Sequence, residues 1–201
     1  MKIDPVTFEV DASGGTRPVY VWEAPVRVWH WLMAVAMFAM IITGYLIGRP
    51  LVSNLGDTWI TYDFGYVRMV HFAAGLFFTA LFIYRLFWVA VGNRYARMIF
   101  FPPLLSMKWW KAVFAQVASF LFMRKSAPEY AGHNPLAQLA MFAMFVLGSF
   151  VIIITGLALY AQSWGWDTSW MAWFGWVFVL FGDAQAVRTV HHVMMYVFIL
   201  F

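Results

Sequence analysis

The sequence contains no cysteine and little charge. Of its 201 residues, 11% are Asp, Glu, Lys or Arg and 64% are hydrophobic, whereas a soluble domain carries about 25% charged residues. Without cysteine, the chain can form no disulfide, thiolate zinc site, iron–sulfur cluster or thioether-linked haem. Any iron in this chain must therefore be held by histidine or methionine.

Long uncharged segments take the place of the missing charge. Residues 28–48 and 136–166 contain no charged side chain, and a helix needs about 20 residues to cross a bilayer. A third apolar segment, 67–91, is interrupted only by Arg68 and Arg85, which can snorkel to an interface. A fourth begins at Arg188 and is still apolar at Phe201. It is too short to span a bilayer, so we expect the native helix to continue beyond that residue.

These segments predict an all-α membrane protein in which four transmembrane helices form one bundle. We expect a single domain, 1–201, that opens with a polar tail, 1–27. Residues 112–123 and 169–181 are apolar but too short to cross, so they are expected to be interfacial helices. The predicted spans are approximately 28–48, 67–91, 136–160 and 188–201.

The distribution of basic residues predicts the orientation in the membrane. Residues 1–20 lack the apolar core and small-residue cleavage site of a signal peptide. Most basic residues lie in the tail and in the loop after the second span, and basic loops stay in the cytoplasm. The net charge of +4 therefore indicates contact with anionic lipid and gives no sign of nucleic-acid binding. The basic residues assigned to the cytoplasmic side are Lys2, Arg17, Arg27, Arg94, Arg97, Lys108, Lys111, Arg124 and Lys125, against Arg49, Arg68 and Arg188 outside.

Four of the five histidines lie at or inside predicted spans, where an unpaired ionisable group is costly. For any one of them, a helix-end hydrogen bond to a carbonyl is an equal alternative to a functional role. His71 and His191 each lie about one turn inside a span that enters from the outer side, so their imidazoles can reach one iron. Two histidines fill both axial positions of a haem, which makes an electron carrier rather than a substrate-binding site.

Helical register indicates a second site on the inner side. Residues 14 apart are about 21 Å apart along a helix and differ by about 40° in direction. His30 and Gly44 are separated by 14 residues on one predicted helix, and His71 and Arg85 have the same separation on the next. Gly44 and Gly75 would leave room for a macrocycle, while Arg85 could pair with a haem propionate or a quinone carbonyl, or simply snorkel.

The remaining histidines and the methionines are weaker candidates. By the same spacing, a partner for His30 on the fourth span would fall about 14 residues after His191, beyond Phe201. His133 is disfavoured as that partner, because it lies in a turn that precedes a helix start. His192 points about 100° away from His191 and is expected to be a hydrogen-bonding neighbour. Met194 and Met195 are expected to pack or to face lipid. The Ile-Thr-Gly steps at 42–44 and 154–156 are typical of close helix packing.

Five short segments carry a resemblance to a known family. Over residues 20–201 they resemble the cytochrome b subunit of membrane-bound nickel-iron hydrogenases, itself similar to the gamma subunit of formate dehydrogenase. The sequence departs from the family's span-four pattern at Arg188, which replaces a histidine, and over 192–196, where a glycine is missing. The segments are 23–31 (EAPVRVWHW), 65–72 (GYVRMVHF), 92–95 (GNRY), 132–135 (GHNP) and 154–160 (ITGLALY).

The resemblance implies an outer haem b held by His71 and His191, and an inner haem that involves His30 and a late histidine absent from this sequence. It also implies an iron–sulfur small subunit and a nickel-iron large subunit on the periplasmic side of a bacterial inner membrane, and quinone as electron acceptor. The chain itself would split no hydrogen, and it would carry one or two haems.

Three other functions remain open on the sequence alone. The electron donor could be formate dehydrogenase or another periplasmic oxidoreductase. The chain could be a non-redox anchor whose histidines merely pack. A transporter is disfavoured, because the sequence has no pair of Gly- or Pro-interrupted half-helices.

Overall fold

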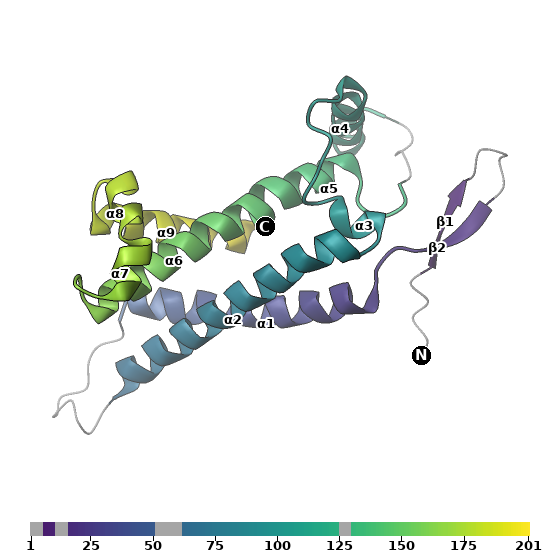
Figure 1. The fold of residues 1–201 in the computed structure, drawn as a ribbon. Helices are drawn as coiled ribbons and strands as arrows, with labels where there is room; N and C mark the ends of the chain where they lie inside the picture. The colour runs from purple at the N-terminus through teal and green to yellow at the C-terminus, as the bar shows by residue number, and fades with distance from the viewer. Residues whose placement is uncertain (1–5, 11–15, 51–61, 125–129) are drawn as a thin grey trace. The chain divides into compact units, whose positions relative to one another are not determined.

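The computed structural model describes residues 6–10, 16–50, 62–124 and 130–201, and these are almost entirely helical (Figure 1). The all-α prediction is therefore confirmed. The polar tail contains a small antiparallel hairpin, which pairs Val6 with Tyr20 and Val10 with Thr16. The elements are β1 Val6–Val10, β2 Thr16–Tyr20, α1 Ala24–Gly48, α2 Asp63–Val91, α3 Arg94–Arg97, α4 Met107–Phe120, α5 Pro135–Ala140, a π-helical segment Met141–Leu147, α6 Gly148–Trp164, α7 Ser169–Phe174, α8 Trp176–Phe181 and α9 Ala184–Leu200.

Three of these helices are long and apolar enough to cross a membrane, so the chain is a multi-pass membrane protein. They are Ala24–Gly48, Asp63–Val91 and Pro135–Trp164. The first two begin a few residues before their predicted starts at 28 and 67, and the third begins next to its predicted start at 136. The third begins at 135 because Asn134 Oδ1 accepts from the Ala137 N–H at 2.8 Å and proline suits the first helical position. The fourth predicted helix is α9, which begins at Ala184 behind a similar cap from Asp183.

The chain divides into two compact units. Unit 1 comprises Met1–His30 and Tyr84–Val146, and unit 2 comprises Trp31–Ile83 and Leu147–Phe201. The helices α1 and α2 contribute residues to both units. The single domain 1–201 remains a prediction.

In unit 1, three of the short segments noted in the sequence meet at one joint. The Glu23 carboxylate accepts from Trp88 Nε1 at 2.9 Å and from the Asn93 N–H at 3.0 Å. Asn93 in turn caps α3 by accepting from the Ala96 N–H at 2.9 Å. Gly132 adopts a φ of +84°, and a Cβ there would lie 3.1 Å from the Tyr95 ring. These residues therefore have a structural role at the ends of the helices.

A second contact in unit 1 fixes α4 against α5. Ser106 caps α4, so this helix begins before the predicted 112. The Trp109 indole Nε1 donates to Gln138 Oε1 at 3.1 Å in a buried setting, and Gln138 Nε2 donates to the His133 carbonyl at 2.9 Å. Both ends of the Gln138 amide are thus satisfied.

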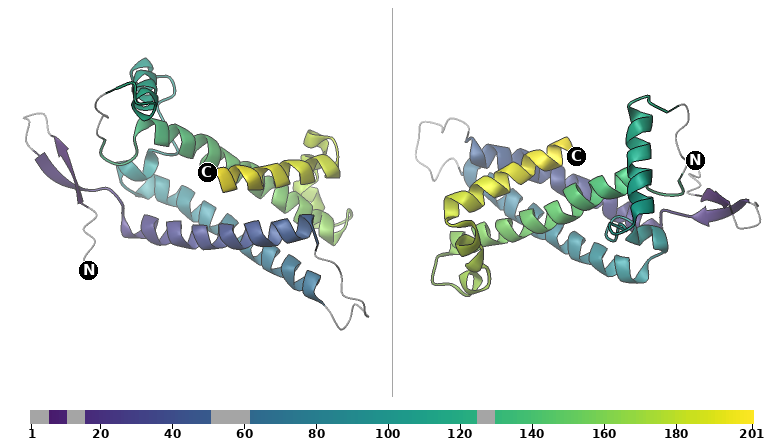
Figure 2. Two further views of the ribbon diagram at one scale, coloured as in Figure 1. Left: turned by 180° about the vertical axis from the view of Figure 1, so that it is seen from behind. Right: turned by 90° about the horizontal axis from the view of Figure 1, so that it is seen from above.

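In unit 2, α6 and α9 lie side by side, and α7 and α8 pack against them (Figure 2). The centre of this packing consists of small or branched side chains with no exposed area, namely Ala158, Ala161, Val177 and Val187. Small residues let helix backbones approach closely where lipid provides no hydrophobic driving force between helices.

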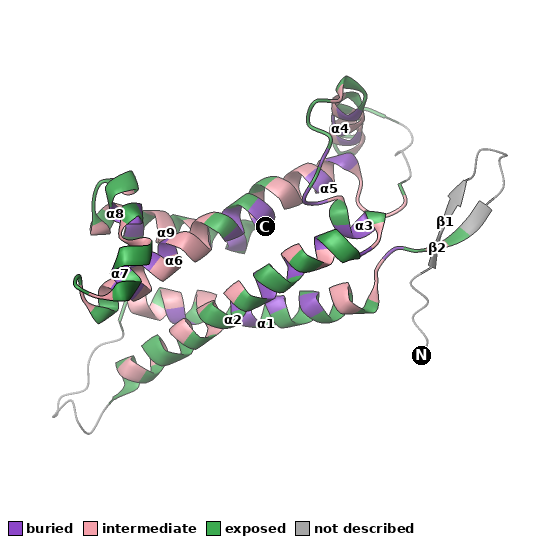
Figure 3. Ribbon diagram, in the orientation of Figure 1, coloured by how far each residue is buried: buried purple, intermediate pink, exposed green. Residues whose placement is uncertain are grey.

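The outer faces of the long helices remain apolar and exposed (Figure 3). On α1, Trp31, Val35, Phe38 and Ile42 are 70%, 67%, 68% and 46% exposed, and their spacing puts them on one face. A continuous exposed apolar stripe is unfavourable in water but suits contact with lipid chains.

We predict that Trp109→Phe destabilises the protein by about 1–3 kcal/mol, because the buried Gln138 oxygen loses its donor. The matched control is Trp110→Phe, which removes an exposed bond of 2.8 Å to the Leu104 carbonyl that water can replace. Thermal unfolding of the purified protein in detergent measures both. Equal destabilisation by the two variants would contradict this assignment.

Candidate functional site

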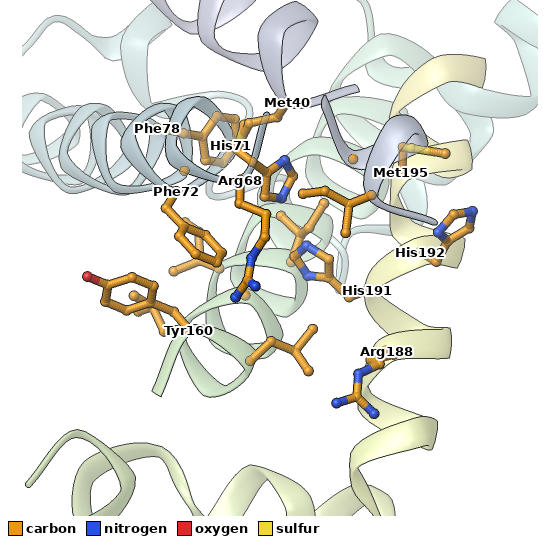
Figure 4. A pocket seen from close by; sticks show the side chains of 18 of the residues that line it. Met40, Arg68, His71, Phe72, Phe78, Tyr160, Arg188, His191, His192 and Met195 are labelled. Carbon is orange, nitrogen blue, oxygen red and sulfur yellow. The ribbon is translucent and has the colours of Figure 1, made fainter. Parts of the chain in front are cut away.

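Unit 2 contains a cavity of about 710 Å³ lined by α1, α2, α6 and α9 (Figure 4). This volume lies within the usual range of cofactor sites, about 300–1,000 Å³. Most lining residues are aliphatic, aromatic or glycine, and the polar ones are few: Arg68, His71, Thr79, Tyr160, Gln162, Ser163, Arg188, His191 and His192. An apolar cavity with a few convergent polar groups is typical of a binding site for a bulky organic cofactor.

The two histidines expected to bind iron meet in this cavity. His71 on α2 and His191 on α9 have ring centres 6.3 Å apart with the ring planes at 76°, and Figure 4 shows the rings near one another. Two metal–nitrogen bonds of about 2 Å, plus the distance from each nitrogen to its ring centre, put axial imidazoles about 6 Å apart. The separation therefore fits one iron between them, and ligation itself remains a prediction.

Each of these imidazoles is hydrogen-bonded to a threonine on a neighbouring helix. Thr43 Oγ1 on α1 lies 2.9 Å from His71 Nδ1, and Thr155 Oγ1 on α6 lies 2.9 Å from His191 Nδ1. These threonines belong to the two Ile-Thr-Gly steps, which the sequence analysis attributed to packing alone. The sequence signal that could have found them is the repeat of the same tripeptide in two membrane helices.

The glycine of each step leaves space for the histidine ring. A Cβ added to Gly44 would lie 3.2 Å from His71 Cε1, and one added to Gly156 would lie 3.0 Å from His191 Cε1. Gly44 is thus next to His71, and it also lines the cavity. A Cβ on Gly75 would have only the Met40 sulfur within 4 Å, at 3.8 Å, so that position borders open cavity space.

Aromatic side chains of α2 pack against aromatic side chains of α6 and α9. Phe72 and Tyr160 meet edge to face with centres 5.1 Å apart, and Phe78 and Phe198 do so at 6.4 Å. Such pairs are each worth about 0.5–1.5 kcal/mol beyond the area they bury. They hold the helices that carry His71 and His191 at a fixed separation.

Two arginines on the cavity wall were not predicted as site residues. The Arg68 guanidinium lies 5.6 Å from the centre of the Phe72 ring, and Arg188 donates to Gln162 Oε1 at 2.9 Å. Each precedes a cavity histidine by three residues, in the matching segments RMVH (68–71) and RTVH (188–191). Since residues three apart share a helix face, this spacing could have identified them.

Two neighbours of His191 on α9 also line the cavity. His192, expected to be a hydrogen-bonding neighbour about 100° around the helix, is one of them, and a Cβ on Gly48 would lie 2.8 Å from its Cε1. Met195, expected to pack or to face lipid, is 7% exposed and lines the cavity too. The cavity therefore covers a wider arc of α9 than a single-ligand face.

The other predicted site residues belong to unit 1. His30 on α1 is exposed. Arg85 on α2 is 2% exposed, so it does not reach outward to an interface. Its Nη2 donates to the Ala96 carbonyl at 2.7 Å, and the guanidinium carbon lies 5.3 Å from the Trp29 ring centre and 5.0 Å from that of Phe100.

Part of this arginine has no partner. Arg85 Nε and Nη1 are buried without a hydrogen bond in the part of the chain that the structure describes. His133 lies nearby in the same unit, where burial and the charge of Arg85 lower its pKa. The ring of His133 is therefore neutral at pH 7, and it meets Trp22 edge to face at 4.7 Å.

Within the described ranges, no three His, Asp or Glu side chains gather where they could hold a bare metal ion. A pair of histidines can ligate iron fully only when the cofactor supplies the other ligands, as the four nitrogens of a porphyrin do. The donor set, the ring separation and the cavity volume thus all fit haem.

Comparison with known proteins agrees with this chemistry. The family model of prokaryotic cytochrome b561 matches residues 21–201. A protein of Azotobacter vinelandii named probable Ni/Fe-hydrogenase B-type cytochrome subunit is 44% identical over 183 residues, which cover 91% of this chain and 76% of that protein. Proteins with the same type of name are 41% identical in Rhizobium leguminosarum bv. viciae, covering 97% and 83% of the two chains, and 45% identical in Escherichia coli K12, covering 71% and 60%.

The match extends over the cavity, both cavity histidines and all three helices that can cross a membrane. The chain belongs to the prokaryotic cytochrome b561 family and is accordingly a multi-pass membrane cytochrome that carries haem b.

Proposed function

We propose that this chain is the membrane cytochrome subunit of a nickel-iron hydrogenase, which relays electrons from the periplasmic iron–sulfur small subunit to quinone and anchors the complex. The observation that carries the proposal is the pairing of His71 and His191, with ring centres 6.3 Å apart inside an apolar cavity. If both imidazoles hold the iron of a haem, no coordination position would remain for a substrate, which suits electron transfer.

The residues around the cavity suit a haem b. His71 and His191 would be its axial ligands, and Gly44 and Gly75 would leave room beside the macrocycle. Arg68 and Arg188 line the same cavity, and their charges would offset those of the two propionates. When bound, the haem would supply reversible one-electron chemistry.

The relatives' names support hydrogenase as the partner, since each is called a Ni/Fe-hydrogenase B-type cytochrome subunit. The absence of cysteine from the chain means that it can hold no nickel-iron centre or iron–sulfur cluster, so the large and small subunits must provide both. Membrane lipids surround the apolar faces of its helices. A formate dehydrogenase, with its own iron–sulfur donor, is the alternative partner, and a non-redox anchor is the second alternative.

We place the complex in the bacterial inner membrane, with the N-terminus in the cytoplasm and the partner subunits in the periplasm. The basic loops support this orientation, because nine of the 13 basic residues lie in the tail and the long second loop. His71 and His191 then belong to the periplasmic half of the protein, near the electron donor.

Quinone reduction would take place at the cytoplasmic end, where His30 and Arg85 lie. The free Nε and Nη1 of the buried Arg85 can donate to a quinone carbonyl or to a propionate of an inner haem. His30 would be one ligand of that inner haem. One haem is thus assigned to His71 and His191, and a second depends on another ligand besides His30.

We predict that His71→Ala and His191→Ala each lose the outer haem, because neither remaining imidazole can complete the axial pair. The pyridine haemochrome assay gives haem per chain for each variant in the purified complex. His133→Ala is the control, since its ring is held by Trp22 in unit 1, and it should keep the wild-type haem content. His30→Ala tests for the inner haem. Full haem retention in both His71→Ala and His191→Ala would reject the ligand assignment.

A second prediction identifies the electron donor. In membranes that contain the complex, hydrogen should reduce the b-type haem, as seen in the reduced-minus-oxidised spectrum, while formate should not. Reduction by formate alone would favour the alternative partner. The absence of any b-type band would favour the non-redox anchor.

A third prediction concerns Arg85. Arg85→Gln should leave haem reduction by hydrogen intact but slow quinone reduction at least tenfold, because the carbonyl loses its charged donor, worth about 1.5–3 kcal/mol. Lys108→Gln is the control, because it also removes a positive charge from the side of the membrane that the proposal assigns to the cytoplasm. Rapid reoxidation of the haem by quinone in Arg85→Gln would remove Arg85 from the quinone site.

A further inference from the structure

Two copies of one ligand-positioning arrangement face each other across the cavity. The first combines Ile-Thr-Gly at 42–44 with RMVH at 68–71, and the second combines Ile-Thr-Gly at 154–156 with RTVH at 188–191. In both, the threonine Oγ1 is hydrogen-bonded, at 2.9 Å, to Nδ1 of the histidine that ends the second segment. The repetition of sequence and of geometry indicates a shared task.

We propose that Thr43 and Thr155 are positioning residues that fix the tautomer of the two haem ligands. Each hydroxyl oxygen accepts the Nδ1–H of its histidine, which leaves Nε2 deprotonated and able to ligate a haem iron. The proposal rests on the haem ligation by His71 and His191 proposed above. It adds to that assignment what holds each ring in place and which nitrogen binds.

The direction of the Thr43 bond follows from counting hydrogens. A threonine hydroxyl has one hydrogen to donate and two lone pairs. Thr43 Oγ1 donates to the Ala39 carbonyl at 2.7 Å, one turn earlier on α1. The hydroxyl hydrogen is thus already engaged, so the contact of 2.9 Å with His71 Nδ1 must use a hydrogen carried by the ring.

Thr155 repeats the same arrangement on α6. Its Oγ1 donates to the Val151 carbonyl at 2.7 Å and lies 2.9 Å from His191 Nδ1. Here too the hydroxyl can only accept from the ring. In both cases Nδ1 carries the hydrogen and Nε2 has the free lone pair that a metal requires.

Burial makes these bonds persistent. Thr155 is fully buried and Thr43 is 8% exposed, so no water competes for either Nδ1–H. The glycine after each threonine has no side chain to push the ring away, since a Cβ would stand 3.2 or 3.0 Å from Cε1. The threonine therefore orients the histidine ring through a hydrogen bond, and the glycine leaves the space that the ring occupies.

An acceptor on Nδ1–H raises the basicity of a ligating imidazole and fixes its orientation. A more basic ligand stabilises ferric iron over ferrous iron, so it lowers the reduction potential of the haem. The two threonines are thus expected to set the potential of the cofactor as well as its attachment.

The test is a redox titration of the purified complex, followed at the haem absorption band. Thr43→Val and Thr155→Val keep the shape of the side chain and remove the hydroxyl, so each should shift the midpoint potential to a more positive value. Thr43→Ser and Thr155→Ser restore the hydroxyl and should return the potential to that of the wild type. If a valine variant does not assemble, the alanine variant at that position replaces it and is expected to shift in the same direction.

Thr189→Val is the matched control. Thr189 lies on α9 near His191, and its hydroxyl donates to the Gln185 carbonyl at 2.9 Å in an exposed position. It should titrate like the wild type. Wild-type potentials in both Thr→Val variants, or an equal shift in Thr189→Val, would overturn the proposal while His71→Ala and His191→Ala still lose haem. Retention of haem by those two histidine variants would instead refute the ligation on which the proposal rests.

Discussion

The arrangement of unit 2 depends on the cost of burying two imidazoles in an apolar membrane bundle. His71 and His191 lie among aliphatic and aromatic side chains with their ring centres 6.3 Å apart, and a buried polar group is costly unless it is hydrogen-bonded. The chain meets this cost on one nitrogen of each ring with a threonine hydroxyl. In the proposed haem site, the other nitrogen of each ring would ligate the iron.

Several features of the helices follow from that constraint. Threonine lowers helix stability slightly in water, but in a membrane helix its hydroxyl can bond its own backbone, as Thr43 and Thr155 do. Glycine is also unfavourable in a helix interior, yet Gly44 and Gly156 lie where a side chain would press on a histidine ring. Residues that weaken the helices locally are thus placed where they make the site possible.

In unit 1, side chains form hydrogen bonds with polar groups at the ends of helices. Glu23, Asn93 and Gln138 each serve two or more hydrogen bonds that join segments far apart in sequence. Several of the segments that carry the family resemblance belong to this framework rather than to the cavity. Arg85, Gln116 and His133 differ from these residues, because each has a side-chain nitrogen or oxygen that is buried without a hydrogen-bond partner in the described residues. A buried polar atom without a partner is uncommon in folded proteins.

The sequence by itself determined the class of the protein and the identity of the main candidates. Hydropathy and length gave the three membrane-crossing helices, caps such as Asn134 gave their starts, and the depths of His71 and His191 in their spans predicted that the two rings lie close. The positions of residues along one helix do not show which other helix packs against a given face. For that reason the Ile-Thr-Gly steps were interpreted as close helix packing, and Arg85 could not be distinguished from a snorkelling residue. Only the tertiary structure decided these points, because hydrogen bonds such as Thr43 to His71 and Thr155 to His191 depend on how two helices are rotated and shifted against each other, and side-chain order along one helix does not contain that information.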